Sequence, residues 1–118
     1  MDVGSLGTPG IRVRIYFGER DHHGMGTLWS AILDELRRGG AMGATVVRGV
    51  AGFGAHSKIH AASLVDLSSD LPLVCEWVDT EETVNALLPK IETLLQGGMM
   101  TIEPIRILRY QPHTDRGD

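Results

Sequence analysis

The chain has 118 residues, 42% of them hydrophobic and 22% charged, which is the balance of a single soluble globular domain. Its formal net charge of −4 argues against binding to nucleic acid, and no apolar run is long enough to insert into a membrane. One cysteine, Cys75, excludes an internal disulfide, so we expect a buried thiol in the reducing cytoplasm.

The first part of the chain predicts a strand followed by a helix. Residues 1–10 contain glycine and proline and are expected to be a flexible lead-in. Apolar and polar side chains alternate strictly in residues 11–17, as in a half-buried strand. The period becomes helical in residues 26–40, where apolar side chains recur every four positions and Gly39 and Gly40 should end the helix.

The middle of the chain predicts β-structure on both sides of a glycine-rich loop. Residues 44–54 are rich in β-branched side chains and are expected to form a strand that runs into the loop. The apolar stretches 61–67 and 73–78 are interpreted as one interrupted arm of a hairpin, because the turn residues of 68–72 separate them.

A second helix and a last strand complete the expected elements. Residues 79–98 have a helical apolar stripe, and Asp79 with Glu82 fits an acidic variant of the capping box that marks a helix start. Residues 101–110 form the expected final strand. In this strand Pro104 indicates an edge position, because proline cannot donate a hydrogen bond to a neighbouring strand.

The order of elements is β-α-β-β-α-β, which predicts a single α+β domain at residues 11–110 and a flexible tail at 111–118. This is the ferredoxin-like arrangement, in which two helices cover one face of an antiparallel sheet. The other face must carry one of two apolar sets from the third strand: Leu73, Cys75 and Trp77, or Val74 and Val78. Association of several subunits through their sheets would cover that face.

The glycine-rich segment GFGAHSKIH, residues 52–60, and the doubled β-α-β order resemble the PII signalling superfamily. The motifs GATVVRGVAGFG, KIHAA, DLPLV and EWVD resemble more narrowly a small group of PII-like proteins, and the resemblance covers about residues 11–110. It implies a signalling homotrimer that binds a small anionic ligand, for example an adenine nucleotide, in clefts between subunits. It also implies that the loop after the second strand contacts a transporter or a regulatory protein.

Seven residues are candidates for the ligand site. Glycines allow consecutive N–H groups to point into one concavity and hold an anion, which basic side chains can neutralise. The resemblance implies such roles for residues of the loop, of the second glycine turn and of the last strand: Gly52, Gly54, Lys58, Gly97, Gly98 and Arg106. Arg48 is added because it could reach the anion from the second strand. The sequence departs from the family pattern at Leu108, where a second arginine is usual, and in the MMT after Gly98, where a lysine is usual.

Two other functions remain open, and catalysis is not expected. His56 and His60 lie in the loop and could bind a divalent metal in a trimer shaped like the divalent-cation tolerance proteins. A trimer without any ligand could serve only as a scaffold. We expect no enzyme, because the sequence does not group a nucleophile with a base and an orienting acid.

Overall fold

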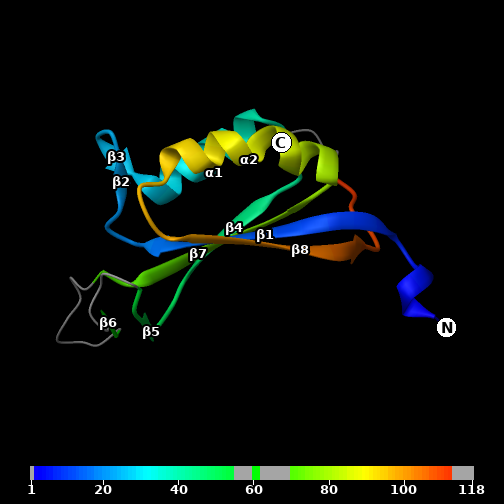
Figure 1. Cartoon of the computed structure of the whole chain (residues 1–118), viewed down its shortest axis with the longest axis horizontal. Helices are drawn as coiled ribbons and strands as arrows, with labels where there is room; N and C mark the ends of the chain where they lie inside the picture. Colours follow the sequence, from blue (N-terminus) through cyan, green and yellow to red (C-terminus); the bar gives the residue numbers. More distant parts are fainter. Residues whose placement is uncertain (1, 55–59, 62–69, 113–118) are drawn as a thin grey trace.

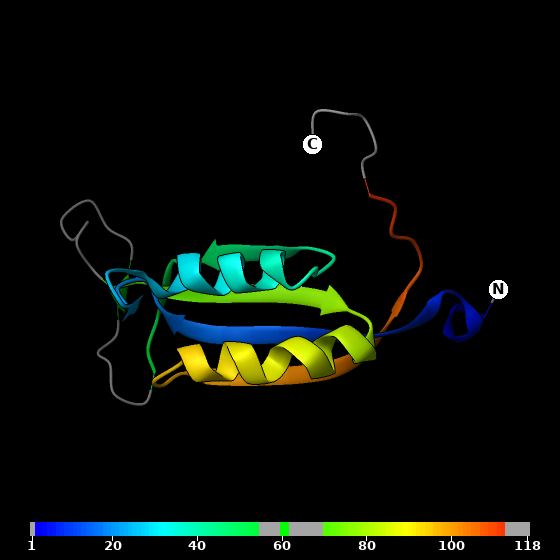
Figure 2. The same ribbon diagram turned by 90° about the horizontal axis from the view of Figure 1, so that it is seen from above.

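A four-stranded antiparallel sheet forms the centre of the fold, and two helices lie side by side over one of its faces (Figures 1 and 2). The computed structural model describes residues 2–54, 60–61 and 70–112. The sheet has the order β4-β7-β1-β8 and consists of β1 (Thr8–Gly18), β4 (Ala44–Arg48), β7 (Pro72–Asp79) and β8 (Met99–Ile107). The helices are α1 (Leu28–Arg38) and α2 (Glu81–Leu94). The predicted α+β, ferredoxin-like fold is confirmed.

Five short elements lie outside this sheet: η1 (Val3–Ser5), β2 (His22–His23), β3 (Gly26–Thr27), β5 (Ala51–Gly52) and β6 (His60–Ala61). Strand β2 pairs with β3 and β5 pairs with β6, so each pair forms a two-stranded sheet of its own. Among the residues that the structure describes, no helix has the length and apolar character needed to cross a membrane.

Several element boundaries differ from the predicted ones. Strand β1 begins at Thr8, inside the segment expected to be a lead-in. The expected strand at 44–54 is divided: β4 ends at Arg48, and the Gly49 amide then donates to the carbonyl of Pro72 at 2.7 Å. This bond continues the β4–β7 register by one residue, and the chain bends at Val50 before it forms β5. Residues 62–69, which hold most of the predicted strand at 61–67, and the end of the tail at 113–118 lie outside the described residues.

The hydrophobic core lies between the sheet and the two helices. Its buried side chains come from β1, β7 and both helices: Val13, Ile15, Phe17, Leu28, Ile32, Leu36, Leu73, Cys75, Trp77, Val84, Leu87 and Ile91. Of the two possible sets on the third strand, the one containing Trp77 thus faces the helices. Val74 and Val78 lie on the opposite side, here called the open face of the sheet. The Cys75 thiol is free and buried, and burial raises its pKa to about 11.

Asp79 is buried at the end of β7 and does not cap helix α2. Its side chain follows the alternation of the strand into the interior, where only 2% of the residue is exposed. The carboxylate accepts hydrogen bonds from Trp77 Nε1, the Met42 amide and the Thr80 amide, each at 2.9 Å. Thr80 is the N-cap instead, since its hydroxyl accepts from the amide of Thr83. The predicted capping box was therefore wrong by one residue.

Charged side chains line the middle of the open face. Arg14 lies opposite Glu76 in the β1–β7 pair, and Arg12 lies opposite Glu103 in the β1–β8 pair. Arg14 Nε is 2.9 Å from Glu76, and Arg14 Nη1 is 3.2 Å from the Glu103 oxygen that also pairs with Arg12 at 3.0 Å. The hydrogen bond to Glu76 is the main reason why the pKa of Arg14 is raised. The open face therefore holds alternating charges as well as valines.

Candidate functional site

The candidate ligand residues are divided between two ends of the sheet. Arg48 pairs with Leu73, which in turn pairs with Phe17. Arg106 pairs with Pro9 at the opposite end of β1. Pro9 and Phe17 are eight residues apart along β1, which corresponds to roughly 26 Å in a strand. We name these the loop end, at Phe17, and the terminal end, at Pro9, where the N-terminus lies (Figure 1).

Of the candidate residues that the structure describes, Arg48 is the basic side chain at the loop end. Its Nη2 atom is 2.5 Å from a carboxylate oxygen of Glu19, and 60% of its side chain is exposed. An exposed ion pair of this kind contributes roughly 0–1 kcal/mol, so an incoming anion could replace the carboxylate at small cost. Arg48 can therefore contact a ligand that approaches the loop end.

The glycines at the loop end have different structural constraints. Gly98 has a φ of +91°, and a Cβ atom there would collide with the Tyr16 carbonyl oxygen, so this position requires glycine with or without a ligand. Among the described residues, and apart from its two chain neighbours, no atom lies within 4 Å of a Cβ built at Gly97. A Cβ at Gly52 would be 3.1 Å from Pro72 Cγ, and Gly54 is exposed. Gly98 is thus required by the backbone, whereas the described residues do not constrain Gly97.

The rest of the predicted loop site lies only partly within the described residues. Lys58 and His56 lie outside the described residues, and His60 is described only by its backbone in β6. In the described ranges, no three histidine, cysteine, aspartate or glutamate side chains are close enough together to hold a metal ion. The roles of Lys58 and of the loop histidines therefore stay predictions.

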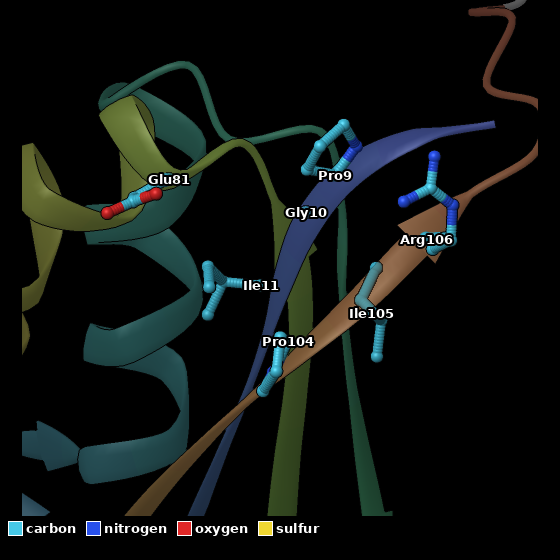
Figure 3. A pocket seen from close by; sticks show the side chains of 7 residues that line it. All are labelled: Pro9, Gly10, Ile11, Glu81, Pro104, Ile105 and Arg106. Atoms are coloured by element: carbon cyan, nitrogen blue, oxygen red, sulfur yellow. The ribbon is translucent and has the colours of Figure 1, made fainter. Parts of the chain in front are cut away.

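A pocket of ≈ 280 Å³ lies at the terminal end, between the start of β1, the end of β8 and the first turn of α2 (Figure 3). It is lined by Pro9, Gly10, Ile11, Glu81, Pro104, Ile105 and Arg106. Glu81 and Arg106 lie on opposite sides of it, with apolar side chains between them (Figure 3). No local pattern in the chain indicates this pocket, because it depends on the pairing of two segments that are about a hundred residues apart.

Arg106 is already occupied by main-chain acceptors. Its Nε donates to the carbonyl of Leu6, and its Nη2 donates to the carbonyl of Gly7 at 3.1 Å. An arginine has five N–H donors, so part of the guanidinium could still bind another group. The structure thus brings Arg48, Gly52, Gly97 and Gly98 toward one end of the sheet and leaves Arg106 at the other.

Comparison with known proteins agrees with this fold. The DUF190 family model, described as an uncharacterized ACR, matches residues 10–107. A UPF0166 protein of Methanocaldococcus jannaschii is 32% identical over 102 residues, which cover 86% of this chain and 94% of that protein.

Two solved structures show the same architecture at low sequence identity. CPII of Thiomonas intermedia, bound to ADP and bicarbonate, has a TM-score of 0.65 and 21% identity, covering 86% of this chain and 90% of that chain. A putative PII-like signaling protein of Thermus thermophilus has a TM-score of 0.62 and 16% identity, covering 86% and 91%. The chain therefore belongs to the DUF190 family and has the PII-like fold that its loop motif and element order resemble.

Proposed function

We propose that this protein is a cytoplasmic, non-enzymatic regulatory protein that binds an adenine nucleotide in the clefts of a homotrimer. Each cleft would combine the loop end of one subunit with the terminal end of the next. The nucleotide phosphates would contact the glycine loop and Arg48 of one copy and Arg106 of the other. CPII, which has a similar fold, is a protein described with ADP and bicarbonate bound, and this supports the choice of ligand.

The separation of Arg48 from Arg106 is the observation that carries the proposal. These side chains lie at opposite ends of the sheet, roughly 26 Å apart by strand length, so one phosphate group cannot contact both in a single subunit. A second copy must supply the other end if both arginines serve one ligand.

The open face supports assembly through the sheets. The face carries Val74 and Val78 beside the charged side chains of β1, Arg12 and Arg14. In the described part of the chain, no helix covers it. The outer edges of β4 and β8 also have no strand partner among the described residues. Sheet faces and edges of this kind are usually covered in stable proteins, and closed symmetric oligomers are the common way to do so.

The base of the loop has exposed apolar side chains, which favour the binding of a protein partner. Val50 is 78% exposed and Phe53 is 73% exposed, on either side of β5. Two exposed large apolar side chains beside a loop are typical of a surface that another protein covers. Nucleotide binding would favour one conformation of the loop, and a transporter or regulatory protein would bind that conformation.

The decisive experiment is subunit complementation. Arg48→Gln and Arg106→Gln should each weaken ADP binding by roughly tenfold or more in calorimetry, because each removes charge-assisted hydrogen bonds. Arg37→Gln, which neutralises an exposed arginine on α1, is the matched control and should bind like the wild type. Co-expressed Arg48→Gln and Arg106→Gln subunits should recover wild-type affinity in some clefts. With random mixing of the two variants, roughly a quarter of the clefts take an intact Arg48 from one subunit and an intact Arg106 from the next.

Complementation, light scattering and ligand titration together separate the alternatives. Mixed oligomers without any recovered sites would refute a cleft that takes Arg48 from one subunit and Arg106 from the next. A monomer in light scattering at micromolar concentration would have the same consequence. If ADP gives no heat while a divalent metal binds tightly and is lost in His56→Ala or His60→Ala, the metal-binding trimer is the correct function. If neither kind of ligand binds, the scaffold is favoured.

A further inference from the structure

The segment before β1, residues 2–7, extends beyond the terminal end of the sheet (Figure 1), and its last two residues, Leu6 and Gly7, contact Arg106 there. Asp2 caps the short helix η1, since its carboxylate accepts from the Gly4 amide at 3.0 Å and its carbonyl accepts from the Ser5 amide at 3.1 Å. The Leu6 amide donates to the Val3 carbonyl at 3.1 Å, and Leu6 is half-buried. We call residues 2–7 the strap.

The strap uses the guanidinium of Arg106 as its anchor. Two nitrogens of this side chain, Nε and Nη2, donate to the successive carbonyls of Leu6 and Gly7. The contact joins two segments that are about a hundred residues apart in sequence. In the described part of the chain, this arginine is therefore bound by the protein's own N-terminal backbone.

Gly7 fixes the strap in this position. Its φ is +74°, a conformation that side chains rarely adopt, and a Cβ there would collide with the backbone carbonyl of Ile107. Gly4 has no such constraint, because the nearest atom to its Cβ position is Asp2 Oδ1 at 3.3 Å, at the end of a side chain that can move. The close approach of the strap to β8 thus depends on glycine at one position.

We propose that the strap is an autoinhibitory segment that competes with the anionic ligand for Arg106. This inference rests on the proposed function, in which Arg106 contacts the nucleotide. Phosphate oxygens form charge-assisted hydrogen bonds with a guanidinium, and these are stronger than bonds to neutral carbonyls. Arg106 therefore binds a phosphate more strongly than it binds the strap carbonyls.

The strap lowers the apparent affinity for the ligand without touching the loop end of its own subunit. The strap occupies the Nε–Nη2 edge of the guanidinium. Only the fraction of molecules with a released strap offers this edge to the anion, and the apparent dissociation constant rises in inverse proportion to that fraction. Binding of the anion in turn holds the strap in its released position. The N-terminal segment thus sets the nucleotide concentration at which the protein responds.

The test uses the full chain and ADP as the probe. In Gly7→Ala the strap cannot approach β8, so ADP should bind about tenfold more tightly in calorimetry. Gly4→Ala is the matched control, with the same substitution in the same segment, and its affinity should equal that of the wild type. Neither glycine belongs to the hydrophobic core, and the strap can detach without opening the sheet, so circular dichroism should show little change in melting for both variants.

A second measurement does not need the ligand. The Arg106 Nε–H signal in nitrogen–proton correlation spectra, assigned by its loss in Arg106→Lys, should exchange slowly in the wild type and in Gly4→Ala. It should exchange rapidly in Gly7→Ala, and ADP should change it in the wild type.

The outcomes distinguish the strap from the proposed function. If the wild type binds ADP and Gly7→Ala frees the Arg106 signal without tighter binding, the strap does not compete and only this inference fails. If the signal stays protected in Gly7→Ala, the close approach at Gly7 does not hold the strap and the inference fails as well. If no variant binds ADP, the proposed function and the strap fail together. If Gly7→Ala binds ADP and neither the wild type nor Gly4→Ala does, the strap blocks the site completely.

Discussion

Replacement of Asp79 by alanine should lower the free energy of unfolding by about 2–4 kcal/mol, because three hydrogen-bond donors lose their acceptor. Trp77 Nε1 is the most costly of them, since the indole is 1% exposed and cannot reach water. The amides of Met42 and Thr80 are half-buried and can recover part of their hydrogen bonding from solvent. Asp79→Asn should cost less, about 1–2 kcal/mol, because its carbonyl oxygen can accept two donors while its NH2 group faces the third.

Urea denaturation followed by far-ultraviolet circular dichroism measures both values, at one fixed subunit concentration because assembly into the proposed trimer would also contribute to stability. The control is a double-mutant cycle with Trp77→Phe, which removes the indole donor but keeps an aromatic ring in the core. The cost of Asp79→Ala should be smaller in the Phe background, because fewer donors are then left without an acceptor. A cost below about 1 kcal/mol for Asp79→Ala, or no coupling with Trp77→Phe, would show that solvent or local rearrangement satisfies these donors.

Gly98→Ala should lower the free energy of unfolding by about 1–3 kcal/mol, because Gly98 has a positive φ and an added Cβ would collide with the Tyr16 carbonyl. Gly97→Ala should change it by less than about 0.5 kcal/mol. Equal costs in urea denaturation would contradict this difference. The Cys75 thiol should react with a disulfide reagent at pH 8 only as fast as the protein unfolds, and a rapid reaction in the native state would show that it is accessible. Because burial raises the pKa of Cys75 from 9.0 to about 11, its contribution to stability is complete below pH 9 and is lost as the pH rises to 11. The stability of Cys75→Ala should therefore fall less steeply over this range, and an equal fall would assign the loss to other groups.

Short-range patterns were enough to predict the two helices, the four strands of the main sheet and the fold class, but not the side on which every side chain lies. Alternation in β1 separates apolar from polar positions, so its core face could be assigned directly. In β7 valines and Glu76 alternate with Leu73, Cys75 and Trp77, so both sets contain apolar side chains, and packing under the helices shows that Trp77 is inside and Val74 outside. Asp79 follows Trp77 by two positions and is buried for the same reason, which the capping interpretation missed.

The candidate site was less predictable, because it depends on strand register rather than on local sequence. A glycine-rich loop can be recognised in a sequence, but the pairing of Pro9 with Arg106 joins two distant segments. That pairing places Arg106 far from Arg48. The composition of residues 1–10 suggested a flexible lead-in, and the positive φ of Gly7 and its contact with Ile107 become visible only in three dimensions.

Gly7 is also the boundary that keeps release of the strap local. The next residue, Thr8, already pairs with Ile107 in the sheet, so displacement of the strap can stop there. Opening of a chain terminus costs far less than unfolding of a core element, because few buried apolar contacts are lost. A ligand could therefore take Arg106 from the strap while β1 and the open face stay in place. Nucleotide affinity depends on the strap in this scheme, but trimer stability depends on the sheet, so Gly7→Ala should change the first without changing the second.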